Sequence, residues 1–174
     1  MLTMPKPDEH AFARREELVA RLREILPAAS VIDSETERRA YDCDAFTMYR
    51  QLPLVVALPE TVPQVAAVLK LAREMDVKVV PRGAGTSLSG GSMPLEDGIL
   101  LSMMKFNRVL EIDWENRCAV VQPGVTNLGI TKAVEHRGFY YAPDPSSQIA
   151  CSIGGNVAEN SGGVHCLKYG LTTN

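Results

Sequence analysis

Apolar positions along the chain form alternating blocks of helical and strand-like periodicity. Leucine recurs every four residues within an amphipathic segment, which predicts a helix from about residue 11 to residue 26, ended by Pro27. A continuous apolar run over residues 54–58 then predicts a buried strand. The change from one period to the other indicates a chain that mixes helices and strands.

A helix-start signal follows this first strand. Thr61 precedes Gln64 by three residues, which is the spacing of a capping box, and we expect the helix to run to about Glu74. Its inner face is predicted to carry Val62, Val65, Ala66, Leu69 and Ala72. A second apolar strand at 77–80 completes a β-α-β unit, so the two strands should run parallel.

The second half of the chain is predicted to contain short strands, one hairpin and one helix. Its expected elements are a strand over 98–103, an antiparallel hairpin of 109–112 and 118–122, a helix from Thr126 to about Arg137 with a left-handed Gly138 after it, and a short strand at 140–141. The predicted fold class is therefore α+β: a small parallel β-α-β subdomain, then an antiparallel-sheet subdomain with helices.

The strand at 77–80 leads into a loop of glycines, small hydroxyls and one arginine, residues 81–91. Glycine lets backbone approach a ligand closely, and successive N–H groups can then form a concavity that binds phosphate. The alternative is an ordinary long surface turn. The expected position at the carboxyl end of a parallel strand favours ligand binding, because ligands of open α/β sheets lie there.

Two common nucleotide loops do not fit this segment. A Walker A loop needs Gly-Lys before Ser or Thr, and no lysine occurs between Pro81 and Gly91. A Rossmann fingerprint needs a third glycine three residues after Gly85, where Leu88 stands. The sequence therefore disfavours a P-loop ATPase and Rossmann-type NAD binding.

A second set of small residues lies in 151–156 and 160–163. Glycine pairs also serve close helix packing, which is the purely structural explanation. Two such sets in one chain, each beside hydroxyl or amide side chains, nevertheless suit a large ligand with a pyrophosphate in its middle.

Composition and charge narrow the class of protein. The chain has 174 residues, 45% hydrophobic and 22% charged, with a net charge of −3, as in an ordinary globular protein. No basic cluster points to nucleic acid, and no apolar run is long enough to span a membrane. The N-terminus lacks the apolar core of a signal peptide, so we expect a cytoplasmic protein. Four scattered cysteines and three scattered histidines predict free thiols and no metal site.

The combined motifs resemble the FAD-binding domain of the vanillyl-alcohol-oxidase, or PCMH-type, flavoprotein superfamily. The residues that carry the resemblance are PRGAGTSLSGG from Pro81, VQPGV over 121–125, and YAPDPSSQIACSIGGNVAENSGGVHCLKYGLT from Tyr141. They are most similar to the branch that oxidises 2-hydroxy acids, which includes the flavin-carrying D subunit of bacterial glycolate oxidase and the D-lactate and D-2-hydroxyglutarate dehydrogenases. The domain is expected over 51–174, after an N-terminal helical segment, 1–50.

The resemblance implies a set of FAD-contacting residues. Pro81 and the backbone of Arg82, Gly83, Ala84, Gly85, Thr86 and Ser87 would wrap the pyrophosphate. Asp144, Pro145, Ser146, Ser147, Cys151, Ser152 and Gly155 would line the ribityl and flavin side. Glu159, Asn160, Ser161 and Gly162 would close round the diphosphate or adenosine. Thr86 stands where some relatives carry a flavin-linked histidine, which implies non-covalent FAD.

The resemblance also implies an activity that this stretch would not complete. Relatives place their catalytic histidines, the metal-binding group of some members and their substrate arginines in a later substrate or cap domain, so we assign no catalytic residue here. His165 is the nearest candidate base, and a packing or hydrogen-bonding role is favoured for it.

Three functional interpretations follow. The first is the FAD portion, incomplete at its C-terminus, of a glycolate or D-lactate dehydrogenase that passes electrons to iron–sulfur and flavin partner subunits and through them associates peripherally with the inner membrane. The second keeps the fold with another substrate, such as D-2-hydroxyglutarate or that of a cell-wall reductase. The third is a non-catalytic FAD-binding module or truncated product.

Overall fold

The computed structural model describes residue 4 and residues 6–173. Their contacts define two compact units: the first contains the chain up to Pro81 together with residues 88–102, and the second contains residues 82–87 and the chain from Met103 onward. No helix among the described residues is long and apolar enough to cross a membrane.

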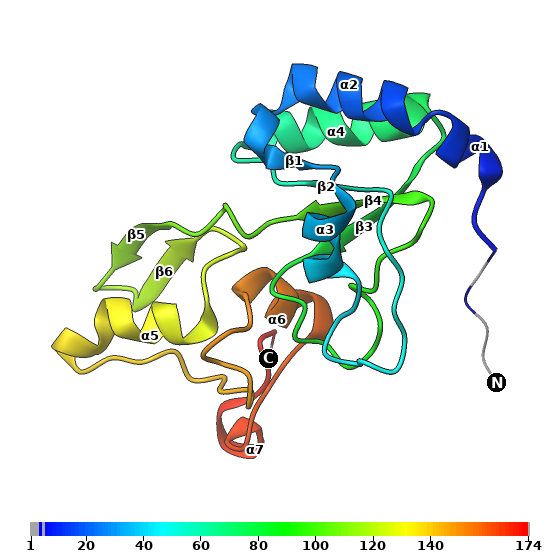
Figure 1. Ribbon diagram of the computed structural model, residues 1–174. Coiled ribbons are helices and arrows are strands. Elements are labelled where there is room, and N and C mark those ends of the chain that lie inside the picture. The colour runs from blue at the N-terminus through cyan, green and yellow to red at the C-terminus, as the bar shows by residue number, and fades with distance from the viewer. Residues whose placement is uncertain (1–3, 5, 174) are drawn as a thin grey trace. The chain divides into compact units, whose positions relative to one another are not determined.

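A four-stranded sheet forms the centre of the first unit (Figure 1). Its strands are β1 (Val31–Ile32), β2 (Val55–Ala57), β3 (Lys78–Arg82) and β4 (Gly98–Ser102), in the order β1-β2-β4-β3. β1 pairs antiparallel with β2, and β2 pairs parallel with β4, with Val55 opposite Ile99. Every residue of β2 and β4 is buried, as continuous apolar runs predict.

The glycine loop leaves the edge strand of this sheet. β4 lies between β2 and β3, so the two strands of the predicted β-α-β unit are not neighbours. β3 also continues through Pro81 to Arg82, whereas the sequence suggested that Pro81 ends it. A proline lacks one ladder donor, and an edge strand tolerates that because one of its sides is unpaired.

The N-terminal helix of the prediction is two helices, α1 (Glu9–Ala13) and α2 (Arg15–Ile25), interrupted at Arg14. α2 lies beside α4 (Val62–Glu74), and both cover the sheet (Figure 1). The predicted leucines Leu18, Leu22 and Leu26 are all buried. The predicted capping box is confirmed, because Thr61 and Gln64 satisfy each other's backbone amides.

The predicted inner face of α4 was largely wrong. Val62 and Leu69 are exposed, and the buried positions are Val68, Leu71 and Ala72. Apolar side chains occur around most of this helix, so periodicity alone fits more than one face. Packing against α2 selects the face, and of the predicted set only Ala72 is buried there.

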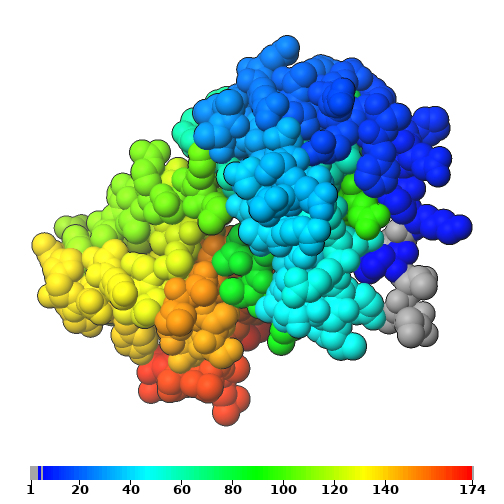
Figure 2. Space-filling view, viewed as in Figure 1, coloured from blue at the N-terminus to red at the C-terminus, as the bar shows by residue number. Residues whose placement is uncertain are grey.

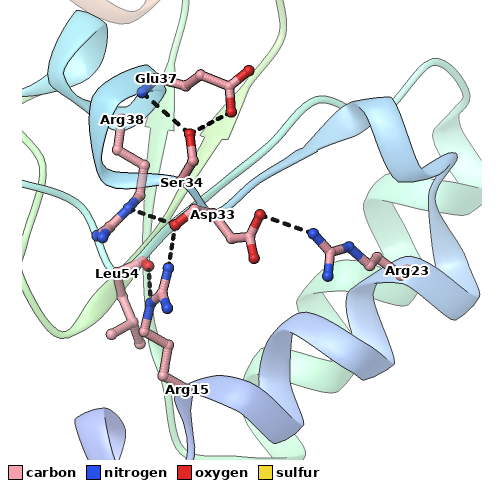
Figure 3. Close-up of polar contacts among 7 residues, drawn as sticks. All are labelled: Arg15, Arg23, Asp33, Ser34, Glu37, Arg38 and Leu54. Atoms are coloured by element: carbon pink, nitrogen blue, oxygen red, sulfur yellow. Dashed lines mark hydrogen bonds and ion pairs between the residues drawn. The ribbon is translucent and has the colours of Figure 1, made fainter.

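Arginines tie the N-terminal helices to the entry of β2. Arg15 donates to the carbonyls of Leu54 and Asp33, and Arg38, at the end of α3 (Glu35–Arg38), donates to the carbonyl of Asp33 as well (Figure 3). The Asp33 carboxylate accepts from Arg23 at 2.8 Å. Short 3-10 turns, Ala28–Ser30 and Arg39–Tyr41, flank this network. In the space-filling view, the lighter-blue and cyan surface of residues 33–53 continues from α2 and extends away from it (Figure 2).

The second unit contains a two-stranded sheet and four short helical elements. β5 (Val109–Asp113) and β6 (Cys118–Val121) form the predicted antiparallel hairpin. The helices are α5 (Asn127–Val134), a 3-10 turn (Glu135–Arg137), α6 (Ile153–Glu159) and α7 (Cys166–Tyr169). Thr126 caps α5, and Gly138 is left-handed, both as predicted. The strand expected at 140–141 is irregular chain instead.

A cavity of about 400 Å³ opens within the second unit. The hairpin, α5 and α6 contribute most of its walls, together with the aromatic side chains of Trp114, Phe139, Tyr140 and Tyr141. Ile153 and Val157 of α6 are among its lining residues.

Candidate functional site

The loop of residues 82–87 presents backbone donors that the protein itself does not use. Among the described residues, the amides of positions 83–86 donate to no backbone or side-chain acceptor. Gly85 adopts φ +71°, a conformation that favours glycine. A run of unengaged amides in a glycine loop is the arrangement that binds phosphate oxygens.

Close packing fixes one end of this loop against the start of α6. A Cβ added to Gly83 would lie 2.1 Å from the Ser152 hydroxyl, so a side chain does not fit there. Ser152 is 4% exposed and caps α6 by accepting from the Gly155 amide at 3.4 Å. Gly83 is therefore required for the approach between the two predicted segments.

A hydrogen bond fixes the other end of the loop. The Ser87 hydroxyl donates to the Glu159 carboxylate at 2.7 Å, at the last residue of α6. The loop therefore runs along α6 from its first turn to its last. The structure brings together Gly83, Ser87, Ser152, Gly155 and Glu159, which the sequence had grouped as one site.

Backbone hydrogen bonds hold α6 in place from the opposite side. Asn127 is fully buried; its amide donates to the Cys151 carbonyl at 3.0 Å, and its side chain donates to the Pro143 carbonyl at 2.9 Å. Gly154 donates to the Pro123 carbonyl at 2.8 Å, and a Cβ there would approach Pro123 to 2.8 Å. The segments before and after α5 thus set the position of the second glycine set.

Asp144 contacts the chain that follows α6. Its carboxylate lies 2.6 Å from His165 Nδ1, and the His165 pair holds the pKa of Asp144 below its ordinary value. Pro145 and Ser147 lie in the adjoining turn, where the Pro145 carbonyl accepts from Gln148 and the Ser147 carbonyl accepts from Cys151. Ser146 is exposed beside them.

Residues 160–162, from the last group of predicted site residues, contact mainly the chain that follows them. The Asn160 side-chain oxygen accepts from the Thr173 amide at 2.9 Å, and the Ser161 carbonyl accepts from Thr172 at 2.8 Å. Gly162 packs against Cys166, at 2.8 Å from an added Cβ. Pro81 belongs to β3, the edge strand of the first unit.

Two buried asparagines were missing from the predicted site. Asn127 Oδ1 and Asn156 Nδ2 are buried, and neither has a hydrogen-bond partner among the described residues. Such orphaned atoms are rare in proteins, and they often mark a place for a water or a ligand. Asn156 stands inside the second glycine set, so its side-chain chemistry was the available signal; nothing in the local sequence distinguishes Asn127.

All four cysteines carry thiol groups, as predicted. Cys43, Cys118, Cys151 and Cys166 form no disulfide with one another. No group of three or more His, Cys, Asp or Glu side chains within the described part of the chain could hold a metal ion.

Unengaged backbone amides and close glycine packing are features that suit a phosphate-containing ligand, and sequence comparison gives the family of the chain. A sequence profile of the FAD-binding-domain family matches residues 53–174, and the chain belongs to that family. The resemblance to vanillyl-alcohol-oxidase-type flavoproteins is thereby confirmed.

The chain is similar in sequence to curated proteins that are named for the oxidation of glycolate or D-lactate. It is 54% identical over 158 residues to the glycolate oxidase subunit GlcD of Escherichia coli (strain K12), covering 91% of this chain and 32% of that protein. It is 46% identical over 140 residues to GlcD of Bacillus subtilis (strain 168), covering 80% and 30%. A D-lactate dehydrogenase of Anaerostipes hadrus is 34% identical over 157 residues, covering 90% and 33%. The chain therefore spans about a third of the length of these relatives.

Solved structures give the same fold. An alkyldihydroxyacetonephosphate synthase matches with a TM-score of 0.79 at 22% identity, covering 98% of this chain and 32% of that one. The 4-ethylphenol oxidase from Gulosibacter chungangensis matches with a TM-score of 0.75 at 27% identity, covering 92% and 31%. The predicted α+β architecture is confirmed: one sheet contains the parallel pair β2 and β4, and the second sheet is antiparallel.

The residues present fit FAD on structural grounds of their own. The four unengaged amides at 83–86 match the need of a diphosphate for donors, and a Cβ at position 83 would collide with the Ser152 hydroxyl that caps α6. The orphaned side-chain atoms of Asn127 and Asn156 add unused polar capacity in the same unit.

Proposed function

We propose that this chain is the FAD-binding portion of a flavin-dependent 2-hydroxy-acid oxidoreductase, and that glycolate is the substrate of the complete enzyme. The observation that carries the proposal is the loop of unengaged amides at 83–86, packed through Gly83 onto Ser152. The similarity to GlcD, which extends over 91% of this chain, supports the choice of substrate. D-Lactate and D-2-hydroxyglutarate are the alternatives, because dehydrogenases for both are also relatives.

Each part of the site has a separate role in this proposal. The amides of 83–86 hold the diphosphate, and Thr86 and Ser87 offer hydroxyls to it. Residues 145–147 with Cys151, Ser152 and Gly155 line the ribityl and flavin side, and Asp144 lies beside them. Residues 159–162 close round the diphosphate or adenosine. FAD, when bound, supplies the electron acceptor for oxidation of the 2-hydroxyl carbon. The chain's own contribution is to bind and orient the cofactor.

Mutation of the loop tests the assignment of the diphosphate site. Flavin-fluorescence titration of the complete polypeptide should show tight FAD binding, and Gly85→Val should weaken it by at least tenfold. A β-branched residue is strained at φ +71° and distorts the amide run. Gly138→Val is the matched control, because Gly138 has φ +78° and lies outside the site. Equal losses in both variants would refute the diphosphate assignment.

We also propose that FAD is bound without a covalent link. Thr86 occupies the loop position where a histidine would form that link, and a threonine hydroxyl offers no comparable nucleophilic nitrogen. Precipitation of the complete protein with acid should therefore release all flavin into the supernatant. A yellow pellet that keeps flavin absorbance after washing in denaturant would contradict non-covalent binding.

The substrate and partners are tested on the complete enzyme. Reduction of an artificial dye should proceed faster with glycolate than with D-lactate or D-2-hydroxyglutarate at equal concentration. We propose iron–sulfur and flavin partner subunits in a glycolate oxidase complex in the cytoplasm, with peripheral attachment to the inner membrane through those subunits; co-purification from native extract tests this. A preference for D-2-hydroxyglutarate would replace the substrate proposal and leave the FAD assignment intact.

The domain assignment gives a further test. We propose that the FAD-binding domain begins near residue 51 and that substrate and catalytic residues belong to a later domain of the complete enzyme. The 174-residue chain alone should then bind FAD weakly and oxidise no glycolate. Submicromolar FAD affinity, or glycolate-dependent dye reduction by this chain alone, would contradict that division.

A further inference from the structure

Asp144 makes contacts that differ in kind from those of the loop at 83–86. Its carboxylate is one-fifth exposed and meets His165 twice: one oxygen lies 2.6 Å from the ring Nδ1, and the other lies 3.5 Å from the backbone amide. A carboxylate that accepts from one residue at both points holds the turn in which that residue lies. Asp144 therefore has a partner inside the protein.

The backbone at Gly163 allows this contact. A Cβ added to Gly163 would lie 2.1 Å from the Asp144 carboxylate and 2.3 Å from the Asp144 carbonyl oxygen. The carbonyl is fixed backbone, so no rotation of the Asp144 side chain would remove the collision. The turn at 163–165 can approach Asp144 this closely only because residue 163 is glycine.

The two segments in contact are both part of the predicted cofactor site. Asp144 belongs to the stretch before α6, and Gly163 and His165 follow the stretch of residues 159–162. In the space-filling view, the chain after residue 160 (red) lies directly against the segment before α6 (orange) (Figure 2). The Asp144 and His165 contact closes the chain that carries α6 into a loop.

Asp144 accepts the hydrogen bond from His165, and an aromatic ring lies on another side of the imidazole. The Tyr169 ring lies 6.4 Å from the imidazole, and the Lys168 ammonium lies over the Tyr169 ring at 4.9 Å. Tyr140 packs edge-on against Tyr169 and hydrogen-bonds with it. A neutral imidazole with its proton on Nδ1 and a protonated imidazole both donate from this nitrogen. The contact therefore does not require His165 to be charged.

We propose that Asp144 and His165 form a clasp that positions residues 159–165 beside the cofactor, and that Asp144 acts through His165 instead of touching the cofactor. This inference rests on the proposed function for its link to FAD. The clasp itself is a property of the polypeptide and can be measured without FAD. Asp144 and His165 are positioning residues in this assignment.

Limited proteolysis of the complete apoprotein tests whether the clasp exists. Trypsin cleavage after the exposed Lys168 should be about fivefold faster in His165→Ala and Asp144→Ala, because a partly exposed hydrogen-bonded pair contributes modestly to local stability. Gly163→Ala should accelerate it at least as much, through the backbone collision. His165→Asn keeps a side-chain N–H at a similar reach and should cleave at nearly the wild-type rate. Cleavage after Lys132, in α5, is the internal reference.

A double-mutant cycle on FAD affinity tests the positioning role. Each alanine variant should weaken FAD binding by about threefold to fivefold, and the double variant should be no weaker than either alone. Multiplied losses in the double variant would show that Asp144 contacts FAD independently and would overturn its assignment. Unchanged cleavage after Lys168 in all variants would overturn the clasp.

The outcomes separate this inference from the proposed function. Faster cleavage with unchanged FAD affinity would overturn the link between clasp and cofactor. If wild-type protein bound no FAD, the proposed function would fail, and the proteolysis result would still decide whether the clasp exists.

Discussion

The side chain that Gly83 lacks controls how closely the loop approaches α6. Gly83→Ala would place a methyl group 2.1 Å from the Ser152 hydroxyl and force the helix cap apart. We expect destabilisation by about 1–3 kcal/mol, the usual range for overpacking, together with weaker FAD binding. Fluorescence of the single tryptophan, Trp114, during urea unfolding reports on this unit.

A second substitution identifies the colliding atom. Ser152→Ala removes the hydroxyl and should itself cost about 1 kcal/mol through loss of the α6 cap. In that background Gly83→Ala should add little, because the next atom, Ser152 Cβ, lies at an ordinary 3.4 Å. Additive losses would mean that Gly83 is required for a reason other than contact with Ser152.

Asp97 holds two parts of the first unit together. It is 2% exposed, lies 2.6 Å from the Lys78 ammonium and accepts from the Asp8 amide at 2.8 Å. Burial alone would raise its pKa, but the Lys78 and Asp8 hydrogen bonds outweigh burial, and the pKa lies below the ordinary 3.8. Asp97→Asn should destabilise the unit by about 1–3 kcal/mol at neutral pH.

The lowered pKa of Asp97 determines how its contribution to the free energy of unfolding depends on pH. A carboxyl with a lowered folded-state pKa stabilises the fold above its unfolded-state pKa, and that stability is lost as the pH falls through the folded-state value. The difference between wild type and Asp97→Asn in urea unfolding should therefore shrink as the pH falls below about 4. A difference that grows in acid would contradict the assigned shift.

Contacts between residues that are distant in sequence could not be predicted from the sequence. The glycine loop and the second set of small residues were recognised from local composition, whereas the cap that Ser152 forms on α6 was not predicted. The Asp144 and His165 contact joins residues 21 apart. It depends on a turn geometry at Gly163 that composition does not reveal. The buried Asn127 was missed for the same reason, since its partners at 143 and 151 become neighbours only through folding.

Among the secondary-structure elements, α4 has the best-defined start. Thr61→Ala removes the side-chain acceptor for the Gln64 amide and should cost about 1 kcal/mol. Hydrogen exchange should accelerate in the first turn of α4 and remain unchanged in α5, which has its own cap at Thr126. Thr61→Ser, which keeps the hydroxyl, should behave as wild type; exchange as fast as in the alanine variant would rule out the cap as the cause.

Features of the helices and strands were predictable where residues close in sequence determine them. They were not predictable where contacts between distant segments determine them. The capping box and the hairpin follow from residues close in sequence, and both were correct. The buried face of α4 depends on contact with α2, and the insertion of β4 between β2 and β3 depends on pairing between distant strands. Short apolar strands specify that they are buried, but they do not specify their neighbours.

For the molecule taken as a whole, the apolar surface of the second unit is its least satisfied feature. Leu110 is 55% exposed and Val120 is 52% exposed on the hairpin, which has only two strands, and neither residue lines the cavity of about 400 Å³. Isolated hairpins are at best marginally stable in water, and apolar patches of this kind mark interaction surfaces. Because the relatives are about three times as long as the chain, we predict that further polypeptide of the complete protein covers this surface.

The prediction is checked by comparing the 174-residue chain with the complete polypeptide. The chain alone should bind a fluorescent hydrophobic dye and self-associate at micromolar concentration, and the complete polypeptide should do neither. Leu110→Lys should reduce dye binding by the chain but lower the thermal stability of the complete polypeptide, because a charge would then be buried without a partner. Met48→Lys, at a 78% exposed site of the first unit, is the control and should change neither. If Leu110→Lys left the complete polypeptide as stable as wild type, the hairpin face would be a solvent-facing surface there, and its apolar residues would need another partner.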